Sequence, residues 1–183
     1  PLITSDGGGA TASVSAAENQ TVVTTVTSTD VDGGAPVYAI AGGADAALFT
    51  INATTGVLSF NSAPNFEAPT DAGANNVYDV TVQVSDGAGG TDTQAIAVTV
   101  TPVNDNAPVI TSNGGGSTAA ISLAENTTAV TTVTATDADL PAQTLTYSIA
   151  GGADAARFTI DASSGALAFA VAPNFEAPAD ANA

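Results

Sequence analysis

The sequence predicts an all-β chain built from antiparallel sandwiches in tandem, and three observations lead to that prediction. Apolar and polar residues alternate over short stretches, as in strands with one buried face. Gly, Asp and Asn separate these stretches at short intervals, which is typical of sandwiches. The chain also repeats itself, since Ala-Glu-Asn at residues 17–19 recurs at 124–126 and Asn-Phe-Glu-Ala-Pro at 65–69 recurs at 174–178. A repeat of this length indicates one structural unit used more than once.

The strands of the first copy follow in order along the chain. Residues 21–29 are rich in Thr and Val, which favours a strand. Residues 49–51 and 57–60 flank a short polar segment ending in Gly56, which predicts a hairpin with the glycine at positive φ. Residues 77–85 and 96–100 alternate strictly, so each is predicted to bury one face.

The repeat fixes the predicted domains. Pro1 corresponds to Pro108, which gives a first repeat over residues 1–107, with a linker at 101–108, and a second repeat over 108–183. The second copy contains no counterpart of 77–100, so we expect it to lack its last two strands. The chain opens inside a repeat, and we expect it to be a fragment. The missing strands are expected either from the same longer chain or from a neighbouring one by strand donation.

The composition limits the partners that the chain is expected to bind. Eighteen acidic residues face one base, Arg157, so the formal net charge is −17. Nucleic acids and anionic membrane surfaces attract Lys and Arg, so neither is an expected partner. Solubility or a salty habitat would explain the total charge. It would not explain the placement, because ten of the eighteen acids lie in the recurring motifs and the linker: Glu18, Asp30, Asp32, Glu67, Asp86, Asp105, Glu125, Asp137, Asp139 and Glu176.

The chemistry available to the chain is limited by the residues it lacks. The sequence contains no Cys and no His, which argues against zinc, copper and haem sites. It also contains no Lys, and without His there is no usual base for a Ser or Thr nucleophile, so no enzyme is expected. Carboxylate and amide oxygens remain, and these are the ligands of Ca²⁺. No apolar run approaches the length of about 18 residues needed to span a bilayer.

The ordered motifs resemble the cadherin repeat, in its bacterial cadherin-like form. They comprise Glu-Asn at 18–19, Asp-x-Asp at 30–32, Tyr-x-Ile at 38–40, Asn-Phe-Glu at 65–67, Val-x-Val-x-Asp-Gly at 82–87 and Asn-Asp-Asn-Ala-Pro at 104–108. All but the last two recur in the second copy. The resemblance implies seven-stranded Greek-key β-sandwiches, with calcium in the linker between successive repeats.

The resemblance also implies a ligand set for that linker. The first repeat would supply Glu18, Asn65 and Glu67, the linker Val103, Asn104, Asp105 and Asn106, and the second repeat Asp137 and Asp139. Two further half-sites are implied, one toward a preceding repeat at Asp30, Asp32 and Asp86, and one toward a following repeat at Glu125, Asn174 and Glu176. Asn65 stands where the family usually has Asp, and Pro102 replaces the Asp that usually opens the linker motif. Both changes predict fewer or weaker ions.

A plainer reading is that these side chains only cap turns. Six other acids are expected to have no ligand role. Asp6, Asp71, Asp92 and Asp180 are predicted to be solvated loop residues, whereas Asp45 and Asp154 are predicted to form the recurrent Gly-Gly-Ala-Asp-Ala-Ala turn.

The predicted function is a calcium-binding extracellular stalk in cell adhesion, secreted to the surface of a bacterial cell. Its partners would be neighbouring repeats of the same or identical chains, with cell-surface or matrix ligands beyond them. A structural filament, sheath or surface-layer subunit is the alternative, and a non-catalytic module of a large secreted enzyme is a third.

Overall fold

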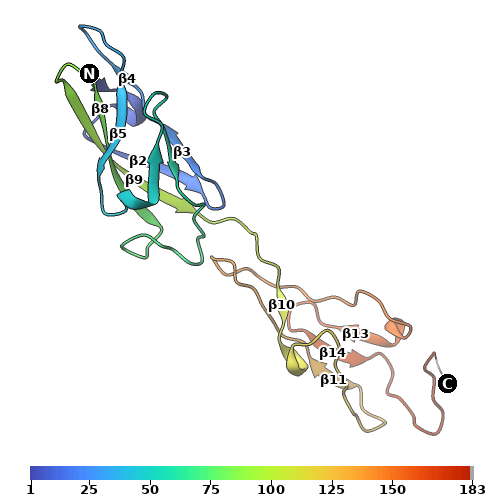
Figure 1. Cartoon of the computed structure of the whole chain (residues 1–183). Helices are drawn as coiled ribbons and strands as arrows, with labels where there is room; N and C mark the ends of the chain where they lie inside the picture. Colours follow the sequence, from blue (N-terminus) through green and yellow to red (C-terminus); the bar gives the residue numbers. More distant parts are fainter. Residues whose placement is uncertain (182–183) are drawn as a thin grey trace. The chain divides into compact units, whose positions relative to one another are not determined.

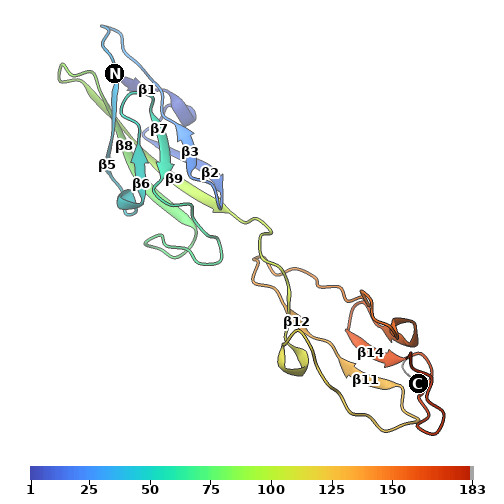
Figure 2. The ribbon, with the colours of Figure 1, turned by 45° about the vertical axis from the view of Figure 1, so that its right-hand side comes forward.

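The computed structural model describes residues 1–181 of the chain, which form an all-β structure (Figures 1 and 2). The contacts divide the chain into two compact units, Pro1–Asn104 and a second unit that begins at Asp105. Among the described residues, no helix has the length and apolar character needed to cross a membrane.

The first unit is a sandwich of a four-stranded and a three-stranded sheet. The four-stranded sheet has the order β2 (Thr11–Ala17), β9 (Thr91–Thr101), β8 (Val77–Ser85) and β5 (Val37–Gly42). The other has the order β3 (Val22–Thr25), β7 (Val57–Phe60) and β6 (Phe49–Ile51). A short pair joins β1 (Leu2–Ile3) to β4 (Ser28–Thr29), and the 3-10 turns η1 (Ser5–Gly7) and η2 (Ala46–Leu48) complete the unit. Strand β2 runs parallel to β9, and the other pairs are antiparallel.

The core forms where the sequence pattern places it. Strand β8 buries Tyr78, Val80, Val82 and Val84, and β9 buries every second residue from Gln94 to Val100. Aromatic rings fill the centre, with Phe49 stacked on Phe60 at 4.6 Å between centroids and Tyr78 edge-on to Phe60 at 5.1 Å. The predicted alternation over 77–85 and 96–100 is confirmed.

The predicted hairpin is also confirmed, and the reason for its glycine is visible. Phe49 pairs with Phe60 across β6 and β7, and Gly56 closes the turn at φ 71°. The Gly56 N–H bonds Asn52 O, and the Gly56 carbonyl accepts the Val26 N–H. A Cβ at residue 56 would lie 2.1 Å from the Val26 carbonyl oxygen, so only glycine fits there.

One predicted strand is wrong in its extent. Residues 21–29 do not form a continuous strand, because β3 ends at Thr25 and β4 begins at Ser28. Between them, Val26 is fully buried and its N–H bonds Gly56 O at 2.8 Å. The chain therefore leaves one sheet and joins another pair at this point.

The second unit repeats part of this architecture. Strands β11 (Ala129–Thr132), β14 (Ala166–Phe169) and β13 (Phe158–Ile160) form a sheet in that order, and β10 (Val109–Ile110) pairs with β12 (Ala135–Thr136). The 3-10 turns η3 (Ser112–Gly114) and η4 (Ala155–Arg157) match η1 and η2. Phe158 stacks on Phe169 at 4.7 Å, as Phe49 does on Phe60.

Two segments with clear sequence counterparts are not strands in the second unit. Within the described residues, 118–124 and 146–151 have no ladder partner, whereas their counterparts β2 and β5 pair with β9 and β8. Ile121 and Leu123 are each 41% exposed, while the counterpart of Leu123, Ala16, is 7% exposed. A strand needs a partner as well as a sequence, so local propensity alone does not form one here.

The hairpin of the second unit carries an acid that makes its stability dependent on pH. Asp161 Oδ1 accepts the Ser163 N–H at 3.0 Å and the Ser164 N–H at 2.8 Å, together with both serine hydroxyls. These bonds, led by that from the Ser164 N–H, hold the pKa of Asp161 well below its usual range. Asn52 occupies the same place in the first unit and caps Thr54 and Thr55 in the same way.

Because the folded-state pKa is depressed, the stabilisation by Asp161 is complete above its unfolded pKa of about 4 and is lost as pH falls below it. Asp161→Asn keeps an acceptor for the turn, as Asn52 shows, but cannot be protonated in this range. Acid titration of the two proteins by circular dichroism from pH 6 to pH 2 should show less loss of the second unit in the variant. Identical acid midpoints would refute this assignment.

Candidate metal centre

Glu18 is the most buried carboxylate of the first unit. It follows β2, is 1% exposed, and its N–H bonds the carbonyl of Thr101 at the end of β9. Its Oε2 accepts the Phe66 N–H and its Oε1 accepts the Val103 N–H, both at 2.7 Å. Each carboxylate oxygen has a second lone pair. Glu18 therefore holds the end of the first unit together and keeps acceptor capacity for a cation.

The Asn-Phe-Glu motif lies beside Glu18. Asn65 Oδ1 accepts the N–H groups of Glu67 and Ala68, at 2.8 and 3.2 Å, in an Asx turn that shapes the motif. Carboxylate oxygens of Glu18 and Glu67 lie within 4.8 Å of each other. Two like charges at about 4 Å repel by roughly 4 kcal/mol at an effective dielectric of 20. A cation between them would remove that cost.

The second unit begins with another acidic group. Asp139 is 2% exposed, and its Oδ1 accepts the Asn106 N–H at 3.0 Å and the Asn106 amide at 2.8 Å. The Asn106 amide also donates to Asp105 Oδ1 at 2.7 Å, and Asp137 Oδ1 accepts the Asp139 N–H at 3.0 Å. The side-chain hydrogen bond from Asn106 lowers the pKa of Asp139, against the effect of burial. Asp139 is therefore ionised at neutral pH.

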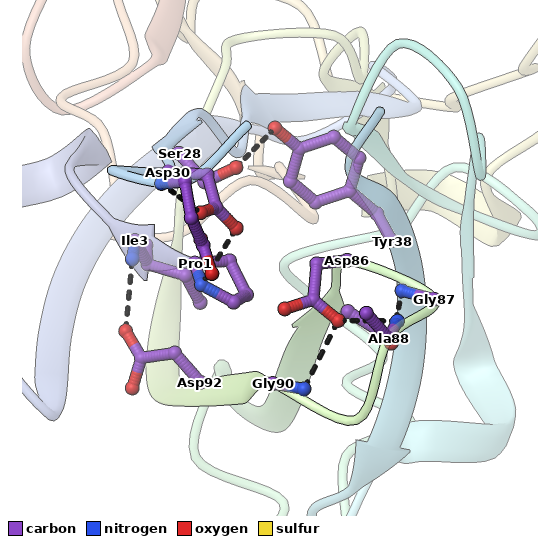
Figure 3. A network of polar contacts seen from close by, with 12 residues as sticks. Pro1, Ile3, Ser28, Asp30, Tyr38, Asp86, Gly87, Ala88, Gly90 and Asp92 are labelled. Carbon is purple, nitrogen blue, oxygen red and sulfur yellow. Dashed lines mark hydrogen bonds and ion pairs between the residues drawn. The ribbon is translucent and has the colours of Figure 1, made fainter. Parts of the chain in front are cut away.

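In the predicted half-site toward a preceding repeat, Asp30 and Asp86 lie close to the amino group of Pro1 (Figure 3). The Pro1 ammonium lies 2.9 Å from Asp30 Oδ2, and the Asp32 N–H bonds Asp30 Oδ1 at 3.2 Å. Hydrogen bonding with Asp32, and next with Pro1, lowers the pKa of Asp30 to about 2, while Asp30 raises that of the amine. Asp86 also acts on this amine, and its Oδ1 caps Ala88 and Gly90 at 2.7 and 3.0 Å. Asp30, Asp32 and Asp86 of this predicted half-site therefore lie near one another.

In the predicted half-site toward a following repeat, Glu125 and Asn174 accept backbone hydrogen bonds. Glu125 Oε2 accepts the Phe175 N–H at 3.0 Å, and Asn174 Oδ1 accepts the Glu176 N–H at 2.9 Å. These bonds reproduce those of Glu18 with Phe66 and of Asn65 with Glu67. Glu125 is exposed, unlike Glu18, which is 1% exposed.

The donors suit a hard cation. The side chains near Glu18 and near Asp139 offer carboxylate and amide oxygens, and the chain contains neither Cys nor His. Ca²⁺ takes 6 to 8 oxygen ligands in flexible geometry, whereas zinc and copper prefer nitrogen and sulfur. The predicted residues therefore fit calcium by chemistry. The ligand roles of all these residues stay predictions, including those of Asn104 and of the Val103 and Asn106 carbonyls.

Two acids that were predicted to be solvated loop residues, Asp71 and Asp92, make structural hydrogen bonds. Asp71 is 6% exposed, and its oxygens accept the N–H groups of Asn75 and Asn76, both at 3.0 Å. Asp92 Oδ2 accepts the Ile3 N–H at 2.8 Å and so ties β1 to β9. Asp45 is more than a turn former, because its side chain is 5% exposed and bonded at both oxygens. The recurrence of Asp45 and Asp71 as Asp154 and Asp180 was the signal that could have found them.

Comparison with known proteins shows which family the chain with these acidic groups resembles. Residues 11–101 match the Cadherin domain model. They cover β2 to β9 and thus the first unit almost whole. The chain is 37% identical to Cadherin-16 of rabbit (Oryctolagus cuniculus) over 158 residues, which is 77% of this chain and 18% of that protein. It is 42% identical to mouse Protocadherin-15 over 82 residues, or 44% of this chain and 4% of that protein.

Solved cadherin structures share the fold. The Protocadherin gammaB7 EC3-6 cis-dimer structure matches with a TM-score of 0.68 and 23% identity, covering 97% of this chain and 45% of that one. Human Protocadherin-24 EC1-2, Form II, matches with a TM-score of 0.67 and 24% identity, covering 91% of this chain and 77% of that one. The predicted all-β cadherin-type sandwich is confirmed. The chain spans no more than about a fifth of the two relatives named, and these are mammalian, so the bacterial form stays a prediction.

Proposed function

We propose that this chain is an extracellular adhesion-type segment in which calcium joins successive cadherin repeats into a stiff stalk. Its partners would be neighbouring repeats of the same or identical chains. A stalk of this kind positions a binding surface at a distance and performs no catalysis. The Cadherin domain match over 11–101 and the absence of His and Lys both support a non-catalytic role.

One observation carries the proposal. The linker backbone is bound by carboxylates from each side in turn, since Val103 donates to Glu18 in the first unit and Asn106 donates to Asp139 in the second. Only two residues separate these anchors along the chain. The linker is thus attached to an acidic group in each unit through its own hydrogen bonds, which supports the proposal of a cation at the linker.

Electrostatics supplies the reason for a divalent ion. Glu18, Glu67, Asp105, Asp137 and Asp139 would place five carboxylates around the linker, in a chain with a net charge of −17. Unneutralised, such a group drives the repeats apart. Calcium would convert the repulsion into a set of bonds, and its release would leave the linker free to bend. Because Asn65 and Pro102 carry no charge, we expect weaker binding than in a fully acidic linker.

Calcium titration by isothermal calorimetry tests the assignment. Asp139→Asn is expected to weaken calcium binding by about tenfold or more, because it removes a charge from a buried ligand position. Asp6→Asn removes the same charge outside the proposed site and is the matched control, since Asn113 occupies that place in the second repeat at a similar φ. Circular dichroism would confirm that both variants fold. Equal affinity in the chain and in both variants would refute the site.

A further inference from the structure

Two buried carboxylates of the first unit lie outside the candidate metal centre. Asp45 and Asp71 are 5% and 6% exposed, although the sequence offers no base near them. A buried carboxylate without a cationic partner is costly unless hydrogen bonds replace its water. The hydrogen bonds of Asp45 and Asp71 therefore identify the segments that these carboxylates hold in place.

Asp45 fastens a long loop to the sheet. Its Oδ1 accepts the Ala72 N–H at 2.7 Å and its Oδ2 accepts the Asp79 N–H in β8 at 2.8 Å. Its own N–H bonds Asp79 O at 3.0 Å, so the attachment to β8 has two points. Both carboxylate oxygens are thus occupied by backbone donors from opposite sides, the loop on one and the strand on the other.

The attachment continues from the loop to Glu18. Asp71, next to Ala72, accepts the Asn76 N–H at 3.0 Å, and the Asn76 amide donates to the Phe66 carbonyl at 2.9 Å. The Phe66 N–H in turn donates to Glu18 Oε2 at 2.7 Å. Hydrogen bonds and the covalent chain together therefore connect Asp45 to the carboxylate of Glu18, through Phe66, the residue before Glu67.

We propose that Asp45 is a positioning residue of the metal centre: with Asp71 and Asn76 it holds the loop 61–76 in place and so fixes Asn65 and Glu67 beside Glu18. As far as ion affinity is concerned, the inference rests on the proposed function. The loop is long, and β7 and β8 are the strands that flank it in the sequence. Without Asp45 the loop would lose its bond at Ala72 and the link through Asp45 to Asp79 of β8, whereas the bond from the Thr70 N–H to Tyr78 Oη would remain. The positions of Asn65 and Glu67 would then vary more.

The second repeat contains the same contact. Asp154 Oδ1 accepts the Ala181 N–H at 2.8 Å, and both pairs are 27 residues apart in the chain. The loop contact therefore occurs in both repeats.

Asp45→Asn is the most informative variant. An amide is isosteric with the carboxylate, but one of its two ends is a donor, so either Ala72 or Asp79 would face an N–H in place of an acceptor. Asn76→Gly is the second variant and interrupts the series at another bond. Residue 76 has φ 62°, which glycine adopts without strain, so only the amide contact to Phe66 is lost. Asp154→Asn in the same full chain is the matched control.

Two measurements separate the positioning role from the ion. Amide hydrogen exchange at Phe66 and Glu67 in chelator measures the order of the loop without calcium. Calorimetric titration measures the calcium dissociation constant. We expect Asp45→Asn and Asn76→Gly to speed Phe66 exchange at least tenfold and to raise the calcium dissociation constant about tenfold, as supporting residues of metal sites do. Asp154→Asn should change neither.

Unchanged Phe66 exchange in both first-repeat variants would overturn the inference, as would faster exchange with unchanged calcium affinity. If the unaltered chain binds no calcium, the proposed function fails, and the exchange rates alone then decide whether Asp45 holds the loop. If Asp45→Asn is unfolded by circular dichroism, the same two readouts on Asn76→Gly decide the question.

Discussion

Glu18→Ala is expected to destabilise the first repeat by about 2 to 5 kcal/mol, even without calcium. The substitution leaves the N–H groups of Phe66 and Val103 without their acceptor, and each bond is 2.7 Å long in the native protein. A buried donor left unsatisfied costs about 1 to 3 kcal/mol, and charge-assisted bonds are at the strong end of that range. Because Val103 is 41% exposed, most of the loss is expected from the Phe66 N–H. The loss should appear in urea unfolding followed by circular dichroism in chelator.

Glu125→Ala is the matched control, because Glu125 is the same residue of the second repeat but is exposed and accepts one backbone bond, from Phe175 at 3.0 Å. We expect its cost to be below about 1 kcal/mol, since exposed groups exchange their partner for water. Equal losses in the two variants would contradict the account of Glu18 as a buried anchor. Calcium binding should fall in Glu18→Ala and persist in Glu125→Ala.

Removing calcium is the second large effect we expect. An ion that binds only the folded protein stabilises it by about 2.7 kcal/mol at a concentration of 100 times the dissociation constant. For repeats of this size, that corresponds to a rise in melting temperature on the order of 10 °C. In chelator the linker acids repel one another, so small-angle scattering should give a broader distribution of interatomic distances. Magnesium at the same concentration is the control, because it requires stricter octahedral geometry.

The fold could be predicted from local patterns because most of its strands have a clear sequence signal of their own. Period-two alternation identified β8 and β9, and Gly56 marked the hairpin of β6 and β7. The side chains assigned around the linker could be predicted only through the repeat and the family resemblance. The structure brings Glu18 near Glu67, and Asp105 and Asn106 near Asp139, each within its own unit.

The remaining features depend on partners distant in the sequence. Asp71 resembled a solvated loop acid because its own loop bonds and the contact of Ala72 with Asp45 cannot be read from composition. The second copies of β2 and β5 have strand-like sequences, yet they lack ladders in the described chain. Ala72 and Asp45 are 27 residues apart, and strand pairing likewise joins residues distant in the sequence, so local propensity does not record these contacts.

Thermal unfolding of the full chain in calcium and in chelator tests the central claim most directly, since it asks whether the acids around the linker bind an ion that the folded protein needs. We predict a melting temperature higher by about 10 °C in saturating calcium, with the increase reduced or lost in Asp139→Asn and kept in Asp6→Asn. A melting temperature that is the same in calcium and chelator would contradict the claim and leave these carboxylates as caps for turns and the linker backbone.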